Sequence, residues 1–234
     1  MITRNLKGKI LYIGSDGNER GREWFSFTHS QDGQRTLRAY CEIDDTEVQG
    51  DVVYTMGPDW RPLDCFNRLH VKGRFLGTGW MRFTPEQAEL EVFNTELGRS
   101  EQKFKLDQPA QSLGAHPLTC DVLHLTQFDH AKSEKVQTVP GAWSTSPLPN
   151  GASGPWLENR PLTIEYLGPE KITVRAGTFD AHHYRFVLSP NPDGTPRSEE
   201  CWCRHPDYVF IKVEVRGFLK NSTYELVSLE DGAV

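Results

Sequence analysis

The sequence lacks the short motifs that mark nucleotide, metalloprotease and hydrolase chemistry. It contains no G-x-G-x-x-G fingerprint, no phosphate-binding P-loop, no H-E-x-x-H, no G-x-S-x-G and no calcium-binding EF-hand loop. Each of these motifs positions a phosphate, a metal ion or a nucleophile, so their absence leaves nucleotide-dependent chemistry without support. The serines of the Pro- and Gly-rich segment also lack the strand–turn–helix setting of a nucleophile. We therefore predict no cofactor.

An excess of positive charge and a long apolar run are also missing. The formal net charge is −6, so the chain lacks the basic surface that nucleic acid or anionic lipid requires, and we expect no nucleic-acid partner. No window approaches the ~18 apolar residues of a membrane-spanning helix, and residues 1–9 lack the apolar centre of a secretory signal. We expect no membrane span, while a mature secreted form whose signal has been removed stays open.

Cysteine is sparse, and its number is odd. The chain has five: Cys41, Cys65, Cys120, Cys201 and Cys203. Small secreted scaffolds carry cysteines densely and in even number, so this pattern favours reduced thiols. The prediction that follows is a soluble protein of the cytoplasm.

What the sequence does have is alternation of apolar and polar residues, bounded by turn residues such as Asp32-Gly33. The expected strands of the first half are 22–30, 34–43, 51–56, 61–72, 74–84, 88–94 and 99–106, after a short β-like stretch at the N-terminus. Those of the second half are 162–167, 171–176, 179–188, 199–205, 207–217 and 223–229. All-β domains often reach ~200–250 residues, so the 234 residues are expected to form one domain, 1–234. The fold class is all-β and mainly antiparallel: a curled sheet, β-barrel or β-roll of about a dozen strands with one short helix.

Two segments interrupt the alternation. Residues 117–131 are expected to form the helix, because their apolar residues recur at intervals of three and four (Leu118, Val122, Leu125 and Phe128). Residues 139–161 are rich in Pro, Gly, Ser and Asn but contain Trp143 and Trp156. A solvated linker seldom carries two tryptophans, so we interpret this segment as an aromatic loop that packs over a cavity mouth. A linker between two half-domains is the alternative.

Several strands combine a dry face with a face that mixes aromatic and ionisable residues. The plain interpretation is that the mixed faces meet solvent. The functional interpretation places part of them inside a curled sheet, where they line a cavity. Arg beside Trp or Tyr can hold an anionic group on an aromatic body. The candidate substrate-binding residues are Arg38, Tyr40, His70, Trp80, Trp202 and Arg204.

The candidate catalytic residues lie on one face of the expected strand 179–188. They are Asp180, His182 and Tyr184, which alternation places side by side. Asp180 could orient the imidazole, and Tyr184 could supply a phenol for proton transfer. His182 would exchange a proton with a ligand whose anion Arg204 stabilises. The competing interpretation is that His182 is a structural hydrogen-bonding group.

The cluster Cys201, Cys203 and His205 offers ligand types that suit zinc. On a strand, however, neighbouring side chains of one face are ~6.6 Å apart, and no matching C-x-x-C occurs elsewhere. We favour two buried thiols beside an exposed histidine and predict no metal site.

Short motifs of the last third of the chain resemble a known family. They are Val174-Arg175-Ala176-Gly177-Thr178-Phe179-Asp180-Ala181, Tyr184-Arg185-Phe186, Trp202, His205-Pro206-Asp207-Tyr208-Val209 and Tyr224-Glu225-Leu226. They resemble the C-terminal part of a bacterial family of unknown function, domain family 3108. The resemblance implies a spiral β-roll, a curled sheet like those of lipoprotein carriers and other calyx-like folds. It implies no catalytic residues, and the chain departs from the family in showing no export signal.

Three functions stay open at this point. The first, which we favour, is a cofactor-independent enzyme of lyase, isomerase or hydratase type that acts on a small aromatic or apolar molecule in a barrel cavity. The second is a non-catalytic carrier for an apolar ligand with a calyx-like fold. The third is a scaffold whose mixed faces meet solvent or another subunit, so that a homo-oligomer stays open.

Overall fold

Fourteen strands form one antiparallel sheet in the computed structural model, which describes residues 1–233. The first half of the chain is a meander of eight strands: β1 (Ile2–Ile13), β2 (Glu19–Ser30), β3 (Arg35–Ile43), β4 (Val48–Met56), β5 (Pro62–Val71), β6 (Arg74–Phe83), β7 (Gln87–Asn94) and β8 (Gly98–Lys105). The second half adds β10 (Val136–Val139), β13 (Leu162–Val174), β14 (Gly177–Phe186), β15 (Ser198–Arg204), β16 (Val209–Arg216) and β17 (Thr223–Ala233).

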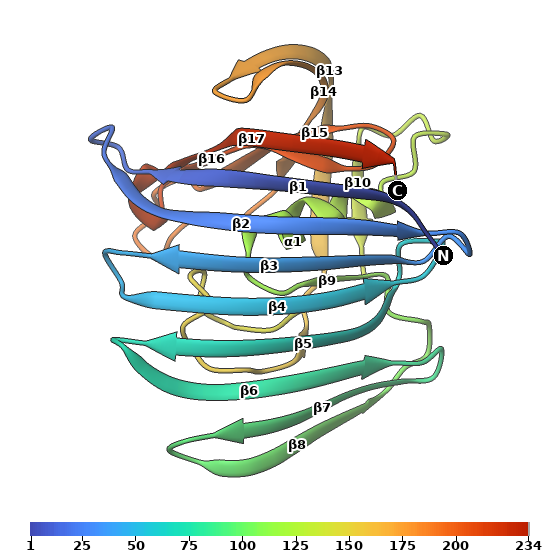
Figure 1. Ribbon diagram of the computed structural model, residues 1–234, viewed down its shortest axis with the longest axis vertical. Coiled ribbons are helices and arrows are strands. Elements are labelled where there is room, and N and C mark those ends of the chain that lie inside the picture. Colours follow the sequence, from blue (N-terminus) through green and yellow to red (C-terminus); the bar gives the residue numbers. More distant parts are fainter. Residues whose placement is uncertain (234) are drawn as a thin grey trace.

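The two halves join through the two ends of the chain. β17 pairs antiparallel with β1, so that Tyr224 lies opposite Tyr12, and β1 then pairs with β2 (Figure 1). The sheet runs from β10 at one edge to β8 at the other, and these two strands do not pair with each other. The sheet is therefore curled and open, and the predicted mainly antiparallel all-β class is confirmed.

A second, smaller layer covers one face of the curled sheet. It contains a three-stranded sheet of β9 (Ser112–Gly114), β11 (Ala142–Ser144) and β12 (Glu158–Asn159), and the helical turns α1 (Leu118–Asp121) and η1 (Val122–Gln127) (Figure 1). Its apolar side chains belong to the same buried core as those of the large sheet: Leu113, Cys120, Leu125, Trp143 and Leu157. The concave side is thus filled by the chain's own residues 106–161.

The predicted helix over 117–131 is shorter in the structure. α1 passes into a 3₁₀ helix that ends at Gln127, and Phe128 is already extended. The side chain of Gln137 holds the backbone just beyond this point, since it accepts from the Asp129 N–H at 2.9 Å and donates to the Asp129 carbonyl at 2.8 Å. These bonds replace the ones that a further helical turn would make.

Two other expectations are corrected. The predicted strands 162–167 and 171–176 form the single strand β13, because Gly168 adopts a positive φ of 122° in an irregularity that lets the strand continue. Residues 139–161 are not a loop throughout, since they contribute β11 and β12. Trp143 is buried against Phe83 and Phe104, whereas Trp156 keeps 48% of its surface exposed. Over residues 1–233 no helix has the length and apolar character needed to cross a membrane.

Candidate functional site

Four of the predicted substrate-binding residues lie on the outer face of the large sheet. Arg38 and Tyr40 share one surface depression with Trp24, whose ring stacks on Tyr40 at 5.7 Å. Trp80 is 43% exposed in another depression, and His70 packs against Phe75 at the end of β5. The inner face of the same strands carries the core, so alternation directs these four side chains outward and they do not meet in one cavity.

Two other predicted partners of His182, Trp202 and Arg204, point elsewhere. Trp202 lies opposite His183, not His182, and stacks on its ring at 4.1 Å. Arg204 is paired with Asp207 and Asp231, the latter at 2.9 Å. Asp180 keeps 88% of its side chain exposed, pairs with Lys171 on β13 and lines the same surface groove as His182. The structure thus keeps Asp180 near His182 but does not bring Arg204 to this groove.

Two members of the predicted catalytic group, His182 and Tyr184, do come together, but with unexpected partners. The Tyr184 hydroxyl lies 2.7 Å from Nε2 of His130 and 2.9 Å from Nε2 of His205. Nδ1 of His182 lies 2.9 Å from the hydroxyl of Tyr166. We call these five residues the His–Tyr cluster.

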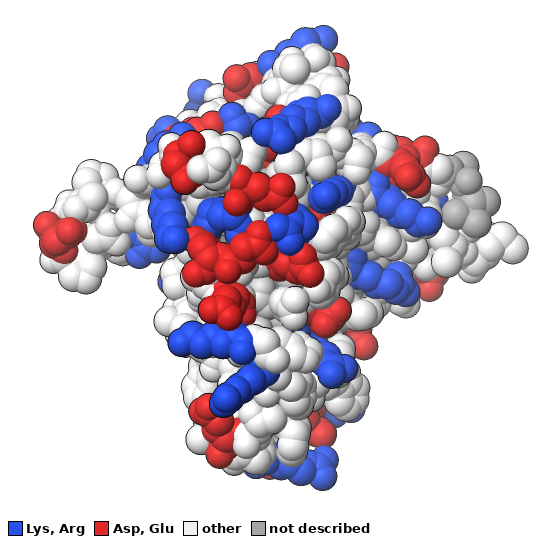
Figure 2. Space-filling model, turned by 60° about the vertical axis from the view of Figure 1, so that its left-hand side comes forward, with Lys and Arg blue, Asp and Glu red and all other residues white. Residues whose placement is uncertain are grey.

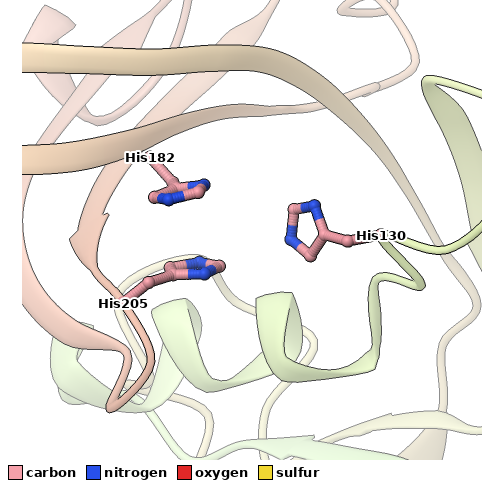
Figure 3. Close-up of side chains that lie close together, drawn as sticks. All are labelled: His130, His182 and His205. Atoms are coloured by element: carbon pink, nitrogen blue, oxygen red, sulfur yellow. The ribbon is translucent and has the colours of Figure 1, made fainter.

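The three imidazole rings of the His–Tyr cluster have a definite arrangement (Figure 3). His182 and His205 stack at 3.7 Å with their planes 8° apart. His130 stands nearly perpendicular to both, with its edge turned toward the edges of the stacked pair. Burial lowers the pKa of all three imidazoles, that of His205 to about 4, and each ring's positive charge would also oppose that of its neighbours.

A separate cavity of about 150 Å³ lies between the large sheet and the inner layer. α1 and η1 place Asp121 and His124 in its wall, and β15 places Glu199 there. Its remaining wall is largely apolar, with Leu162, Phe186, Leu188, Val215 and Phe218 among the lining residues. The cavity combines a dry wall with a few convergent polar groups, which is typical of small-molecule sites.

Asp121 and Glu199 form an acid pair in this wall. Desolvation is the main reason why the pKa of Asp121 lies well above its usual value, and the charge of Glu199 raises it further. Burial likewise raises the pKa of Glu199 to about 7, although Arg197 and Arg160 act in the opposite direction. Burial thus lets Asp121 hold its proton to higher pH than an ordinary carboxyl group, and Glu199, with a pKa of about 7, can gain or lose one near neutral pH, so the pair can act as an acid and a base.

Two histidines line the same cavity and stay uncharged. Burial lowers the pKa of His116 to about 4 and that of His124 to about 3. Nδ1 of His124 lies 2.6 Å from the Ser112 hydroxyl. A side chain at Gly114 would place its Cβ 2.7 Å from Nε2 of His124 and 3.4 Å from Oδ1 of Asp121, so the glycine lets these two groups approach the same point.

Three arginines line the cavity: Arg20, which is paired with Asp45, and Arg160 and Arg197. Arg160 lines it and keeps 48% of its side chain exposed, so the cavity reaches solvent on this side. Arg197 lies with its guanidinium 4.6 Å from the Phe218 ring, and its Nε is buried without a hydrogen-bond partner among residues 1–233. A buried donor without a partner is uncommon in native proteins, and here it belongs to a residue that lines the cavity.

Sequence reasoning missed the cavity residues for physical reasons. Asp121 and His124 fall in the predicted helix, where polar residues between apolar ones suggest the solvated side. Glu199 opens a strand whose sequence Ser-Glu-Glu reads as an exposed edge. Only the packing of residues 106–161 onto the sheet turns them inward. His124 carried the one local signal, since it lies between two leucines in an apolar run.

Comparisons with known proteins agree with the fold and say nothing of activity. No protein-family model matches the chain, and no curated protein matches it significantly. The chain is similar to a crystal structure of a β-barrel-like protein of domain of unknown function DUF1849 from Brucella abortus, with a TM-score of 0.57 and 10% identity over 99% of this chain and 98% of that one. A protein of Bacteroides fragilis with a YmcC-like fold gives a TM-score of 0.43 and 9% identity over 96% and 95% of the two chains. The first likeness shows a shared β-barrel-like fold, and the resemblance to domain family 3108 stays a prediction.

Proposed function

We propose that the chain is a cofactor-independent enzyme that performs acid/base chemistry, of lyase, isomerase or hydratase type, on a small molecule held in the interior cavity. The observation that carries this proposal is the pair Asp121 and Glu199, two carboxyl groups with raised pKa values in one cavity wall. Perturbed acids in a cavity are typical of sites where protons are transferred.

The two carboxyl groups have different roles. Glu199, with a pKa of about 7, is the base that takes a proton from the substrate or from water. Asp121, whose raised pKa favours the protonated form, is the acid that returns one. Arg160 and Arg197 stabilise negative charge that develops on a substrate oxygen, an effect that is strengthened where water is excluded.

The size and lining of the cavity limit the substrate. A cavity of about 150 Å³ holds a molecule of about one aromatic ring. The wall of Leu162, Phe186 and Val215 suits an apolar body, and the arginines suit a carboxylate, enolate or phenolate oxygen on its edge. The substrate class is therefore a small aromatic or apolar molecule that carries one such group.

The apolar wall also favours a second candidate, a carrier that binds the same molecule without changing it. A carrier of long lipids is disfavoured in either case. Residues 106–161 fill the concave side of the sheet and leave about 150 Å³, less than the ~300–1,000 Å³ of common ligand pockets.

Solvent exchange into a panel of small molecules tests the proposal and separates it from the carrier. The protein is incubated in D₂O with single-ring aromatic ketones, keto acids and phenols, and mass spectrometry measures the deuterium that each compound gains at carbon. Saturation-transfer NMR on the same mixture measures binding. We expect deuterium in at least one compound, and a loss of about 10²–10⁴ in exchange rate in Glu199→Gln, the range that a general base contributes.

The controls use residues outside the cavity. Glu200, the neighbour of Glu199, is bound to Arg185 and His183, so Glu200→Gln should exchange deuterium at the rate of the native chain. Binding without exchange would replace the enzyme by the carrier. An absence of binding and of exchange across the panel would reject a site for single-ring molecules.

A further inference from the structure

The His–Tyr cluster is separate from the acid pair and is not used by the proposed chemistry. Its three histidines come from distant parts of the chain: His130 follows η1, His182 lies on β14, and His205 follows β15. The pairing of β14 with β15 places His182 opposite Cys203, two residues before His205. Three segments thus bring imidazoles to one place without a carboxylate between them.

The ring nitrogens are close enough to share one ion. One nitrogen from each of the three rings lies within 4.8 Å of the others. In tetrahedral Zn²⁺ sites the Zn–N distance of ~2.0–2.1 Å places ligand nitrogens about 3.4 Å apart. The nitrogens are therefore up to about 1.4 Å too far apart, and the stacked His182 and His205 rings, whose planes are 8° apart, must tilt so that their in-plane lone pairs converge on one ion.

The Tyr184 hydroxyl marks the point on which two of the nitrogens converge. It contacts Nε2 of His130 and Nε2 of His205 at once. A phenol has one proton, so it can donate to only one of the two imidazoles, and the other must donate to it. Two ring nitrogens thus already point at a single oxygen, as they would at a metal ion or a metal-bound water.

A path from solvent reaches the cluster. His182 and His205 line a surface groove of about 300 Å³ whose wall also includes Glu170, Lys171 and Asp180. His130 is itself exposed. An ion can therefore enter without unfolding. The Tyr166 hydroxyl contacts Nδ1 of His182, so it would orient that ring as hydrogen-bonded partners commonly do and leave its Nε2 for the ion.

We infer that His130, His182 and His205 form a binding site for a divalent transition metal ion, with Zn²⁺ the ion that the three nitrogen ligands suit best. The fourth coordination position faces the Tyr184 hydroxyl and the groove. This assignment differs from the metal set weighed in the sequence: Cys201 and Cys203 are buried in the core, and of that set only His205 joins the site.

Co²⁺, which gives strong visible absorption bands when it is bound tetrahedrally, is the direct probe. Protein without a histidine tag is stripped with a chelator and titrated with CoCl₂, and then with ZnCl₂ in competition. We expect one Co²⁺ per chain, visible bands of tetrahedral type, and their loss when one equivalent of Zn²⁺ is added. Second-sphere changes alone cost 10–100-fold in affinity, so loss of a ligand in His130→Ala or His182→Ala should weaken binding by at least about 100-fold.

His183→Ala is the matched control. His183 is the neighbour of His182 but faces Glu200 and Trp202 on the other side of β14, so this variant should bind Co²⁺ as the native chain does. Circular dichroism of each variant shows whether the sheet is intact, and the exposed His130 is the position where replacement disturbs it least. Stoichiometric binding that survives both His130→Ala and His182→Ala, equal loss in His183→Ala, or no binding by the folded native chain would each overturn the assignment.

Discussion

The hydroxyl of Ser112 lies 2.6 Å from Nδ1 of His124, and both side chains are buried beside the interior cavity, which His124 lines. The contact ties β9 to η1 and holds the ring with Nε2 over Gly114, close to the point that Oδ1 of Asp121 also approaches. On the face of the molecule drawn in Figure 2, by comparison, Lys and Arg side chains are interleaved with Asp and Glu side chains. Four ionisable groups of the cavity wall, Asp121, Glu199, His116 and His124, have displaced pKa values, so their titration is the most direct test of the site.

His124 should stay neutral down to about pH 4, because burial lowers its pKa to about 3. Between pH 6.5 and 3 the unfolded chain binds this proton and the folded chain does not, so acid destabilises the fold. The loss of free energy of unfolding from this one group is about 1.4 kcal/mol per pH unit below pH 6.5. Denaturant unfolding at pH 7 and pH 5 measures it, and His124→Gln should show a smaller drop. An equal drop in both proteins would place the acid sensitivity elsewhere.

The ionisation of Glu199 should change the free energy of unfolding in the opposite direction, so that stability falls as the pH rises. Its folded pKa of about 7 lies above the usual value of 4.5, so the folded chain holds a proton that the unfolded chain has released between these values. The native chain is therefore penalised as the pH rises from 4.5 to 7. Glu199→Gln should be more stable at pH 8 by up to about 3 kcal/mol, or up to about 6–12 °C in Tm, and equal to the native chain at pH 4. Thermal unfolding of both proteins at pH 4 and pH 8 measures this difference. A variant that is less stable than the native chain at pH 8 would mean that the fold stabilises the ionised carboxylate.

Trp143 and Trp156 should differ sharply when truncated. Trp143 is 4% exposed and packs edge-on against Phe104 at 5.2 Å, so Trp143→Ala should cost about 3–5 kcal/mol. Trp156, at 48% exposed, is the matched control in the same segment and should cost less than about 1 kcal/mol. Chemical denaturation of the two variants measures this. Equal effects would show that residues 139–161 do not pack on the sheet as described.

The strands could be predicted because their signal is local. Alternation such as Val209, Ile211, Val213 and Val215 places a buried face on β16 whatever its partner is, and all four are buried. β1 was underestimated because its residues mix Lys and Arg with the core residues Leu6 and Ile10. Its length follows from pairing with β17, about 220 positions away, and no local pattern records that contact.

The sites could not be predicted for the same reason. Alternation correctly grouped His182 with Tyr184, since neighbours of one strand face share a side. It could not supply His130 or His205, which reach the cluster through the end of η1 and the turn after β15. It also could not tell the outer face of β3–β6 from an inner one, so Trp80 and Tyr40 were expected in a cavity and lie on the surface. Which face of these strands is buried depends on the side of the sheet against which residues 106–161 pack.

The five cysteines should all be free and all protected. Each is buried and none is paired in residues 1–233, and burial raises the pKa of the Cys65 and Cys203 thiols, so little thiolate is present at neutral pH. The thiolate is the reactive species, hence a thiol reagent such as Ellman's should modify the folded chain far more slowly than an exposed cysteine. In denaturant without reductant we expect five thiols per chain. A count of three or one would reveal disulfides and would contradict the reducing location predicted from the odd number of cysteines. Rapid modification of the folded chain at one site, with five thiols still counted after unfolding, would instead mean that one of these side chains reaches solvent, and mass spectrometry of the labelled chain would identify it.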